Sequence, residues 1–198
     1  MPGAADFFYE AGTLKRTARS GWALARMANR ESVADHSFRT ALIAMTLAAM
    51  AGADPDRAAT LALLHDLPEA RLGDMHHLTR RYLDEPKPFR QVIDDQTAGL
   101  PAPARDVLRD RAAQWLDQDS MEARLARDAD VLDSVLHVRE SLSDRPELEA
   151  RWLDYLAASV QTETGRAVLA DIRATDPDEW WPRTVTPTPP PPGPSGCA

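Results

Sequence analysis

The chain has 198 residues, of which 43% are apolar and 27% are charged, and its formal net charge is −8. This length allows one domain with a substantial core, and the composition is ordinary for a soluble globular protein. The acidic balance argues against a nucleic-acid-binding surface, which needs clustered basic residues. It leaves room for a small phosphorylated substrate, because a bound metal ion can reverse the local field.

Nothing in the sequence predicts export or a membrane span. The N-terminal stretch "MPGAADFFYEAGTLKR" lacks a basic leader followed by an apolar signal core. The longest apolar stretch, residues 40–53, is too short to cross a bilayer and is typical of a buried helix. The single cysteine, Cys197, allows no internal disulfide and suits a reducing compartment. We therefore expect a cytoplasmic protein with no membrane contact.

Alanine and leucine recur at helical spacing through most of the chain, which predicts an all-α fold. A first helix is expected over about residues 7–19, ending near the Ser20-Gly21 break. Asp35 is expected to cap a second helix over residues 36–51, which Gly52 would terminate.

The next helix is marked at its start by a cap residue and is limited beyond its end by a proline. Asp54 followed by Pro55 predicts an N-cap and a proline in the first turn, opening a helix that runs to about Asp66. Pro68 limits its regular continuation. The stretch over residues 80–106 is expected to form only short pieces, because four prolines divide it: Pro86, Pro88, Pro101 and Pro103.

The second half of the chain predicts two further helical regions and a tail. Asp119 and Glu122 resemble a capping box that opens a helix over about residues 120–142. A last helical region is expected over about residues 147–174. Seven of the sixteen prolines lie in residues 182–198, which we expect to be a disordered proline-rich tail.

The stretch "LALLHDLPEARLGDM" places His65 and Asp66 at the end of an apolar helix. An antiparallel pairing of this helix with the preceding one would bring the start of the first beside the end of the second. His36 would then lie next to His65 and Asp66. Two imidazoles and one carboxylate are a nearly complete site for a first-row divalent metal ion.

A fourth ligand is expected from a distant helix, within "LARDADVLDSVLHV". Asp130 lies between apolar positions and is the acid that we expect to be drawn inward, because a metal ion would satisfy its buried charge. Asp128 and Asp133 are the competing candidates.

Three motifs together resemble a known family. The segments "ADHSFR", "LLHDLPEARLGD" and "ARDADVLDSVL" resemble the His…His-Asp…Asp signature of the HD-domain superfamily of metal-dependent phosphohydrolases. With "LKRTARSGW" added, the pattern is closest to the 5′-deoxynucleotidase branch, the HD domain-containing protein 2 type. The resemblance covers residues 14–152 and predicts one folded domain over residues 1–181, followed by the tail.

The resemblance implies a helical bundle, commonly dimeric, that hydrolyses deoxynucleoside 5′-monophosphates. Cobalt or manganese would be the favoured ion, with magnesium, iron and zinc as alternatives. Glu69 matches the acid that acts on the attacking water, and Asp74 matches an acid that shapes the substrate pocket. The metal ligands implied are His36, His65, Asp66 and Asp130.

The chain also departs from the family pattern. Some bacterial members carry an arginine just before the tryptophan that matches Trp22, whereas this chain has Gly21. Arg19 or Arg39 could supply the phosphate contact instead, and Trp22 could line the pocket. Between Asp74 and Asp130 a proline-broken stretch takes the place of the glutamate- and lysine-rich helix that the resemblance implies, and residues 75–118 are where a different substrate specificity would arise.

Two other functions remain open at this point. One is hydrolysis of nucleoside triphosphates or of a specialised phosphorylated metabolite. The other is a non-catalytic, metal-stabilised regulatory domain. The remaining histidines are expected to have structural roles. His76 and His77 are expected to be loop residues, with substrate contact as the alternative, and His137 is expected to be a core residue or one that supports a metal ligand from behind.

Overall fold

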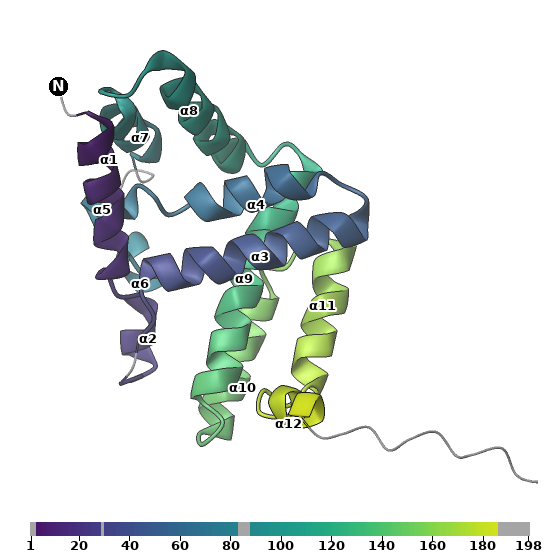
Figure 1. The fold of residues 1–198 in the computed structure, drawn as a ribbon. Coiled ribbons are helices and arrows are strands. Elements are labelled where there is room, and N and C mark those ends of the chain that lie inside the picture. Colours follow the sequence, from purple (N-terminus) through teal and green to yellow (C-terminus); the bar gives the residue numbers. More distant parts are fainter. Residues whose placement is uncertain (1–2, 29, 83–87, 186–198) are drawn as a thin grey trace, which may run out of the picture.

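The computed structural model describes residues 3–28, 30–82 and 88–185. Within these ranges the secondary structure is helical and contains no β-strand, which confirms the predicted all-α class. One 3₁₀ helix, η1, accompanies the α-helices (Figure 1). In chain order the elements are α1 (Ala4–Ala11), η1 (Gly12–Lys15), α2 (Gly21–Leu24), α3 (Val33–Ala51), α4 (Pro55–Leu64), α5 (Glu69–Leu72), α6 (His77–Arg80), α7 (Phe89–Thr97), α8 (Ala102–Asp117), α9 (Met121–Ser141), α10 (Pro146–Ala157), α11 (Glu163–Ala174) and α12 (Trp180–Val185).

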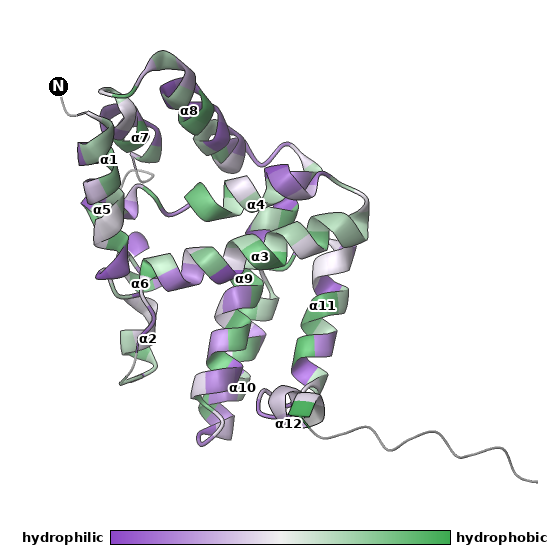
Figure 2. Ribbon diagram, in the orientation of Figure 1, coloured by the Kyte–Doolittle hydropathy of each residue, from purple (hydrophilic) through white to green (hydrophobic). Residues whose placement is uncertain are grey.

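The core is built around the hairpin of α3 and α4 and the long helix α9. Figure 1 shows α3 and α4 side by side with α9 crossing them, and α9 also packs against α10 and α11. Leu47, Leu61, Leu125 and Leu132 from these three helices are almost fully buried in one cluster. Figure 2 shows hydrophilic and hydrophobic residues alternating along α9 and α10, as expected of helices with one face in the core.

The caps of α3 and α4 explain how the hairpin is set. Ser32, not Asp35 as predicted, is the N-cap of α3, because its hydroxyl accepts the Asp35 N–H. The Asp35 carboxylate reaches back to the Ser32 N–H and completes a capping box. Gly52 ends the helix with φ of 69°, as predicted for a left-handed C-cap. Asp54 caps α4, also as predicted.

Between Arg80 and Asp106 the described residues contain one complete helix, the 9-residue α7, in agreement with the prediction of short pieces over residues 80–106. Helix α8 is 16 residues long, because Pro101 lies at its N-cap and Pro103 in its first turn, where proline is tolerated. Ser120, rather than Asp119, caps α9 by accepting the Ala123 N–H. Helix α9 therefore begins at Met121, one residue beyond the predicted start.

The two ends of the chain also differ from expectation. Helix α1 stops at Ala11, where the Thr13 hydroxyl donates to the Glu10 carbonyl at 2.7 Å, and only a 3₁₀ turn follows. The last helical region is two helices, since Thr162 caps α11 separately. Helix α12 extends to Val185, beyond the predicted start of the tail at residue 182, and residues 186–198 lie outside the described residues.

None of the helices in the described ranges is both long enough and apolar enough to cross a bilayer.

Candidate metal centre and substrate cavity

The α3–α4 hairpin brings the predicted histidines and Asp66 together. His36 lies in the first turn of α3, and His65 is the C-cap of α4, so the start of one helix meets the end of the other. The His36 and His65 ring centroids are 5.3 Å apart. Asp66 Oδ2 lies 3.0 Å from Nε2 of His65 and 3.8 Å from Nε2 of His36.

Asp130 reaches the same point from α9. Its Oδ1 lies 3.2 Å from Nε2 of His36 and 3.8 Å from Nε2 of His65. Two atoms that bind one ion at about 2.1 Å lie about 3 to 3.5 Å apart in ordinary coordination geometries. The separations of 3.0 and 3.2 Å fall in this range, whereas the two of 3.8 Å are wider. Both Nε2 atoms are buried and find no hydrogen-bond partner within the described part of the chain.

The other nitrogen of each imidazole is already engaged. His36 Nδ1–H donates to Asp133 at 2.6 Å, and His65 Nδ1–H donates to the Ala62 carbonyl at 2.6 Å. These bonds fix both ring orientations and leave Nε2 as the free ligand atom, which is the usual arrangement around metal-bound histidines. His36, His65 and Asp66 offer ligand atoms that all lie within 4.8 Å of one another and could therefore hold a divalent ion, with Asp130 as the expected fourth ligand.

The charges of the cluster are strongly coupled in the metal-free chain. Burial and Arg19 lower the pKa of His36, but Asp130 and Asp133 outweigh both and raise it to about 9. Burial raises the pKa of Asp66, whereas His65 and Arg19 lower it by more, so the carboxyl stays ionised. Two carboxylates that keep their charge in a buried place attract a cation strongly.

Arg39 does not lie where a phosphate contact would need it. Its guanidinium donates to the buried carboxylate of Asp133 and, at 2.7 Å, to Glu140. Arg39 lines a separate hollow. It is not among the described residues that line the cavity beside His65, Asp66 and Asp130. A fully buried carboxylate needs a counterion, and Arg39 supplies it for Asp133.

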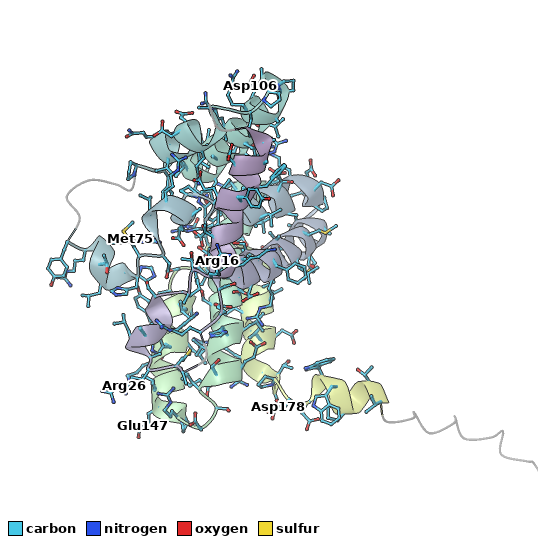
Figure 3. The ribbon with its side chains drawn as sticks, turned by 60° about the vertical axis from the view of Figure 1, so that its left-hand side comes forward. Arg16, Arg26, Met75, Asp106, Glu147 and Asp178 are labelled. Carbon is cyan, nitrogen blue, oxygen red and sulfur yellow. The ribbon has the colours of Figure 1, made fainter. Side chains whose placement is uncertain are left out.

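A cavity of about 590 Å³ opens beside His65, Asp66 and Asp130. Arg19, Trp22 and Asp74, which the sequence proposed for the substrate, all line it. Figure 3 shows the side chains of this region, with Met75 just before α6 and Glu147 in the first turn of α10 as landmarks.

Arg19 lines the cavity and also lies close to Asp66, one of the candidate metal ligands. Its Nη1 lies 3.5 Å from Asp66 Oδ2, and its Nη2 donates to Ser134 Oγ at 3.1 Å. Asp74 accepts the backbone N–H of Ser20 and so fixes the segment that carries Arg19. Trp22 is held by Nε1–H donation to Glu31 at 2.9 Å.

Glu69 lies close to the cluster in sequence but deep in the fold. Only 1% of its surface is exposed, and its backbone N–H donates to the Asp66 carbonyl at 2.9 Å. Arg80 Nη2 lies 3.9 Å from its Oε1. Glu69 is not part of the cavity lining formed by the described residues, so its contact with water or substrate stays a prediction.

Sequence reasoning missed several residues around the site. Glu31 and Ser134 hold Trp22 and Arg19, and no local pattern points to either of them. His137 stacks on Trp22 with centroids 4.8 Å apart, which confirms its packing role. His77 lines the cavity, as the alternative for that residue required. The cavity is also lined by basic residues that the sequence did not single out: Arg80, Arg81, Arg127 and Arg151.

The fold and site thus define a helical metal-binding domain with an adjoining cavity. The profile of the HD domain family matches residues 11–169, and the chain belongs to the HD-domain family. A 5′-deoxynucleotidase, HDDC2 of Danio rerio, is 30% identical over 156 residues, covering 74% of each chain. The human HDDC2 is 30% identical over 140 residues, covering 68% of this chain and 66% of its own.

Solved structures agree in fold. A conserved hypothetical protein from Pyrococcus furiosus has a TM-score of 0.70 and 27% identity, covering 87% of this chain and 100% of its own. An HD phosphohydrolase of cyanophage S-2L, described as bound to dA and one catalytic Zn²⁺ ion, has a TM-score of 0.56 and 19% identity, covering 84% and 96%. The second likeness concerns the fold alone. The resemblance found in the sequence is confirmed at the level of the family.

Proposed function

We propose that this protein is a metal-dependent phosphohydrolase that removes the 5′-phosphate from deoxynucleoside monophosphates. The observation that carries the proposal is the pair of buried Nε2 atoms, of His36 and His65, which face two carboxylates beside a cavity of about 590 Å³. The relatives named 5′-deoxynucleotidase support the choice of substrate.

The proposed metal ligands are His36, His65, Asp66 and Asp130. Imidazole nitrogens favour a transition metal over magnesium. The choice of cobalt or manganese rests on the resemblance to 5′-deoxynucleotidases, with zinc, iron and magnesium as alternatives. A divalent ion bound there would lower the pKa of a water molecule and offset phosphoryl charge.

Arg19 is the proposed phosphate-binding residue. Asp66 and the other acids around the site outweigh burial and raise its pKa, so the guanidinium stays charged. A guanidinium can hold a phosphate through two parallel hydrogen bonds. Asp74 positions this arginine through Ser20, and we assign Arg39 the separate task of holding Asp133 against His36.

Proton transfer is assigned to Glu69. In the reaction the oxygen of a water molecule attacks phosphorus and the bond from phosphorus to the 5′-oxygen breaks. Glu69 would accept a proton from that water and return one to the leaving 5′-oxygen, giving a nucleoside and inorganic phosphate. Helix α5 starts directly after the Asp66 turn, which keeps Glu69 at a fixed place relative to a ligand.

The test is phosphate release from a panel of deoxy- and ribonucleoside mono-, di- and triphosphates. Metal-stripped protein would be resupplied separately with cobalt, manganese, magnesium and zinc. We expect turnover confined to 5′-monophosphates. Asp66→Ala should lose both activity and metal binding, whereas Asp171→Ala, an exposed acid on α11, should retain both.

Glu69→Ala separates the enzyme from a metal-stabilised regulatory domain. It should abolish turnover while a metal ion stays bound, since Glu69 is not one of the proposed ligands. Turnover restricted to triphosphates, or no effect of Glu69→Ala, would contradict the proposal.

We also propose a cytoplasmic homodimer. Phe38, Leu42 and Met45 lie on one face of α3 and are 71%, 56% and 44% exposed, which supports pairing through that face. Light scattering of the full chain would give the mass in solution, and a monomer at all concentrations would contradict the dimer.

A further inference from the structure

Four aromatic side chains form a continuous row along the cavity. Trp22 of α2 packs on Trp152 of α10 with centroids 5.6 Å apart, and Trp152 meets Tyr155 at 6.1 Å. Tyr155 in turn meets the edge of His77 on α6 at 5.5 Å. All four rings line the cavity that holds His65, and we call them the aromatic collar (Trp22, Trp152, Tyr155 and His77).

The two ends of the collar are tied together. Asp74, which lies three residues before His77, accepts the backbone N–H of Ser20, two residues before Trp22. A Cβ placed on Gly21 would lie 3.9 Å from the Cβ of His76, so α2 and the start of α6 are in contact. The collar therefore runs from α2 through α10 to α6 and returns to α2, beside the proposed metal centre.

The two halves of the collar differ in exposure. Trp22 is only 3% exposed and is fixed by Glu31, whereas Tyr155 is 51% exposed and His77 is also exposed. Exposed aromatic surface inside a concave site is available to a ligand and gains free energy when it is covered. Leu78, which also lines the cavity and is 50% exposed, extends this apolar surface.

We propose that the collar binds the nucleobase of the substrate by stacking it against Tyr155 and His77. This inference rests on the proposed function for the phosphate ester, which it places between Arg19 and the metal cluster. A ligand that fills both regions must carry a phosphate at one end and a flat ring at the other. The nucleoside monophosphate is the class with that shape.

Stacking reads the face of a ring rather than its hydrogen-bonding edge, so it tolerates every base. The enzyme should therefore accept all deoxynucleoside monophosphates and favour purines, which offer the larger face. A sugar phosphate without a base should be a poor substrate, because it leaves Tyr155 uncovered.

The experiment compares deoxyadenosine 5′-monophosphate with 2-deoxyribose 5-phosphate, using the full metal-loaded chain. The variant Tyr155→Leu should raise KM for the nucleotide by about 5- to 30-fold, the effect of losing one stacking face. It should leave kcat/KM for the sugar phosphate unchanged. Tyr155→Phe keeps the ring and should behave as the wild type, as should Tyr9→Leu, a matched change at a tyrosine of α1 that is 80% exposed.

Binding of deoxyadenosine, which has no phosphate to hydrolyse, gives a readout that does not need turnover. Quenching of tryptophan fluorescence should report its affinity, and Tyr155→Leu should weaken it by the same factor. Equal kcat/KM for nucleotide and sugar phosphate in the wild type, or equal losses on both in Tyr155→Leu, would overturn the proposal. If no monophosphate is hydrolysed but deoxyadenosine binds in a Tyr155-dependent manner, the collar stands and the proposed reaction fails.

Discussion

Asp128 is a fully buried carboxylate on α9 that holds the start of α11. Its oxygens accept the backbone N–H groups of Gln161 at 2.7 Å and Thr162 at 2.8 Å, and the Thr162 hydroxyl at 2.6 Å. The Thr162 hydroxyl accepts the Gly165 N–H at 2.9 Å and so caps α11. The change Asp128→Ala removes the acceptor of three donors at once, and we expect it to destabilise the whole α9–α11 contact.

The magnitude follows from those three bonds. A hydrogen bond to a charged group contributes about 1.5–3 kcal/mol, but the three are not additive because water can enter the space left behind. We expect a loss of about 3–5 kcal/mol in the free energy of unfolding, out of a typical total of about 5–15 kcal/mol. For a chain of this length that corresponds to about 6–20 °C in Tm.

Urea unfolding followed by far-UV circular dichroism would measure this loss. Asp171→Ala, an exposed acid on α11, is the matched control and should stay within about 0.5 kcal/mol of the wild type. Unfolding of Asp128→Ala at the same urea concentration as the control would refute the reasoning. Loss of metal binding without loss of stability would instead make Asp128 a ligand in place of Asp130.

Gly165 gives an independent check on the same contact. A Cβ on this residue would lie 2.3 Å from Asp128 Oδ2 and 3.0 Å from Val160 Cγ1. Gly165→Ala should therefore destabilise the wild type, and should cost less in the Asp128→Ala background, where the carboxylate is gone. Additive effects in this double-mutant cycle would show that the two side chains do not meet.

Three further predictions concern the cavity and its metal cluster. Asp133→Asn should weaken divalent-ion affinity by about 10- to 100-fold in calorimetric titrations, because an amide cannot accept from both His36 and Arg39; unchanged affinity would contradict this. The pKa of His36 is raised to about 9, above about 6.5 in the unfolded chain. The contribution of protonated His36 to the free energy of unfolding is therefore full below pH 6.5 and is lost as the pH rises to 9. Chelator-treated protein should accordingly lose up to about 3 kcal/mol of urea-measured stability over that range, and a rise would contradict the assignment. Glu31→Ala should raise KM by about 2- to 10-fold through loss of its bond to Trp22, with Glu31→Gln restoring it in the same steady-state assay.

The hairpin that carries the metal cluster could be predicted because its signals are local. Gly52 and Asp54 mark the turn between two apolar helices, and their conformations follow from residue type. Once the turn is placed, antiparallel packing brings His36 to His65 without any knowledge of the rest of the chain. The prediction of Asp35 as the cap of α3 is wrong because a capping box contains two candidate residues and only the backbone distinguishes them.

Other features depend on elements that lie far apart in sequence. The aromatic collar joins α2, α6 and α10, and nothing in the spacing of Trp22, His77 and Tyr155 predicts that they meet. Arg39 lies one turn after His36, which made it a reasonable phosphate ligand. Arg39 donates to the buried Asp133 instead. That carboxylate needs a counterion only because the packing of α9 on α3 buries it, which the local sequence does not show.

Helical spacing distinguishes only some of the three candidate acids of α9, which are Asp128, Asp130 and Asp133. At about 100° per residue, Asp128 points about 170° away from the mean direction of the other two, so periodicity alone assigns it to a different neighbour. Asp130 and Asp133 are three residues apart and share a face, about 60° from one another. No spacing argument separates them, because both reach the same ring: Asp130 lies at Nε2 of His36 and Asp133 at Nδ1. The charge of Arg39 engages Asp133 and leaves the Asp130 carboxylate beside the cavity, which supports Asp130 rather than Asp133 as the proposed metal ligand.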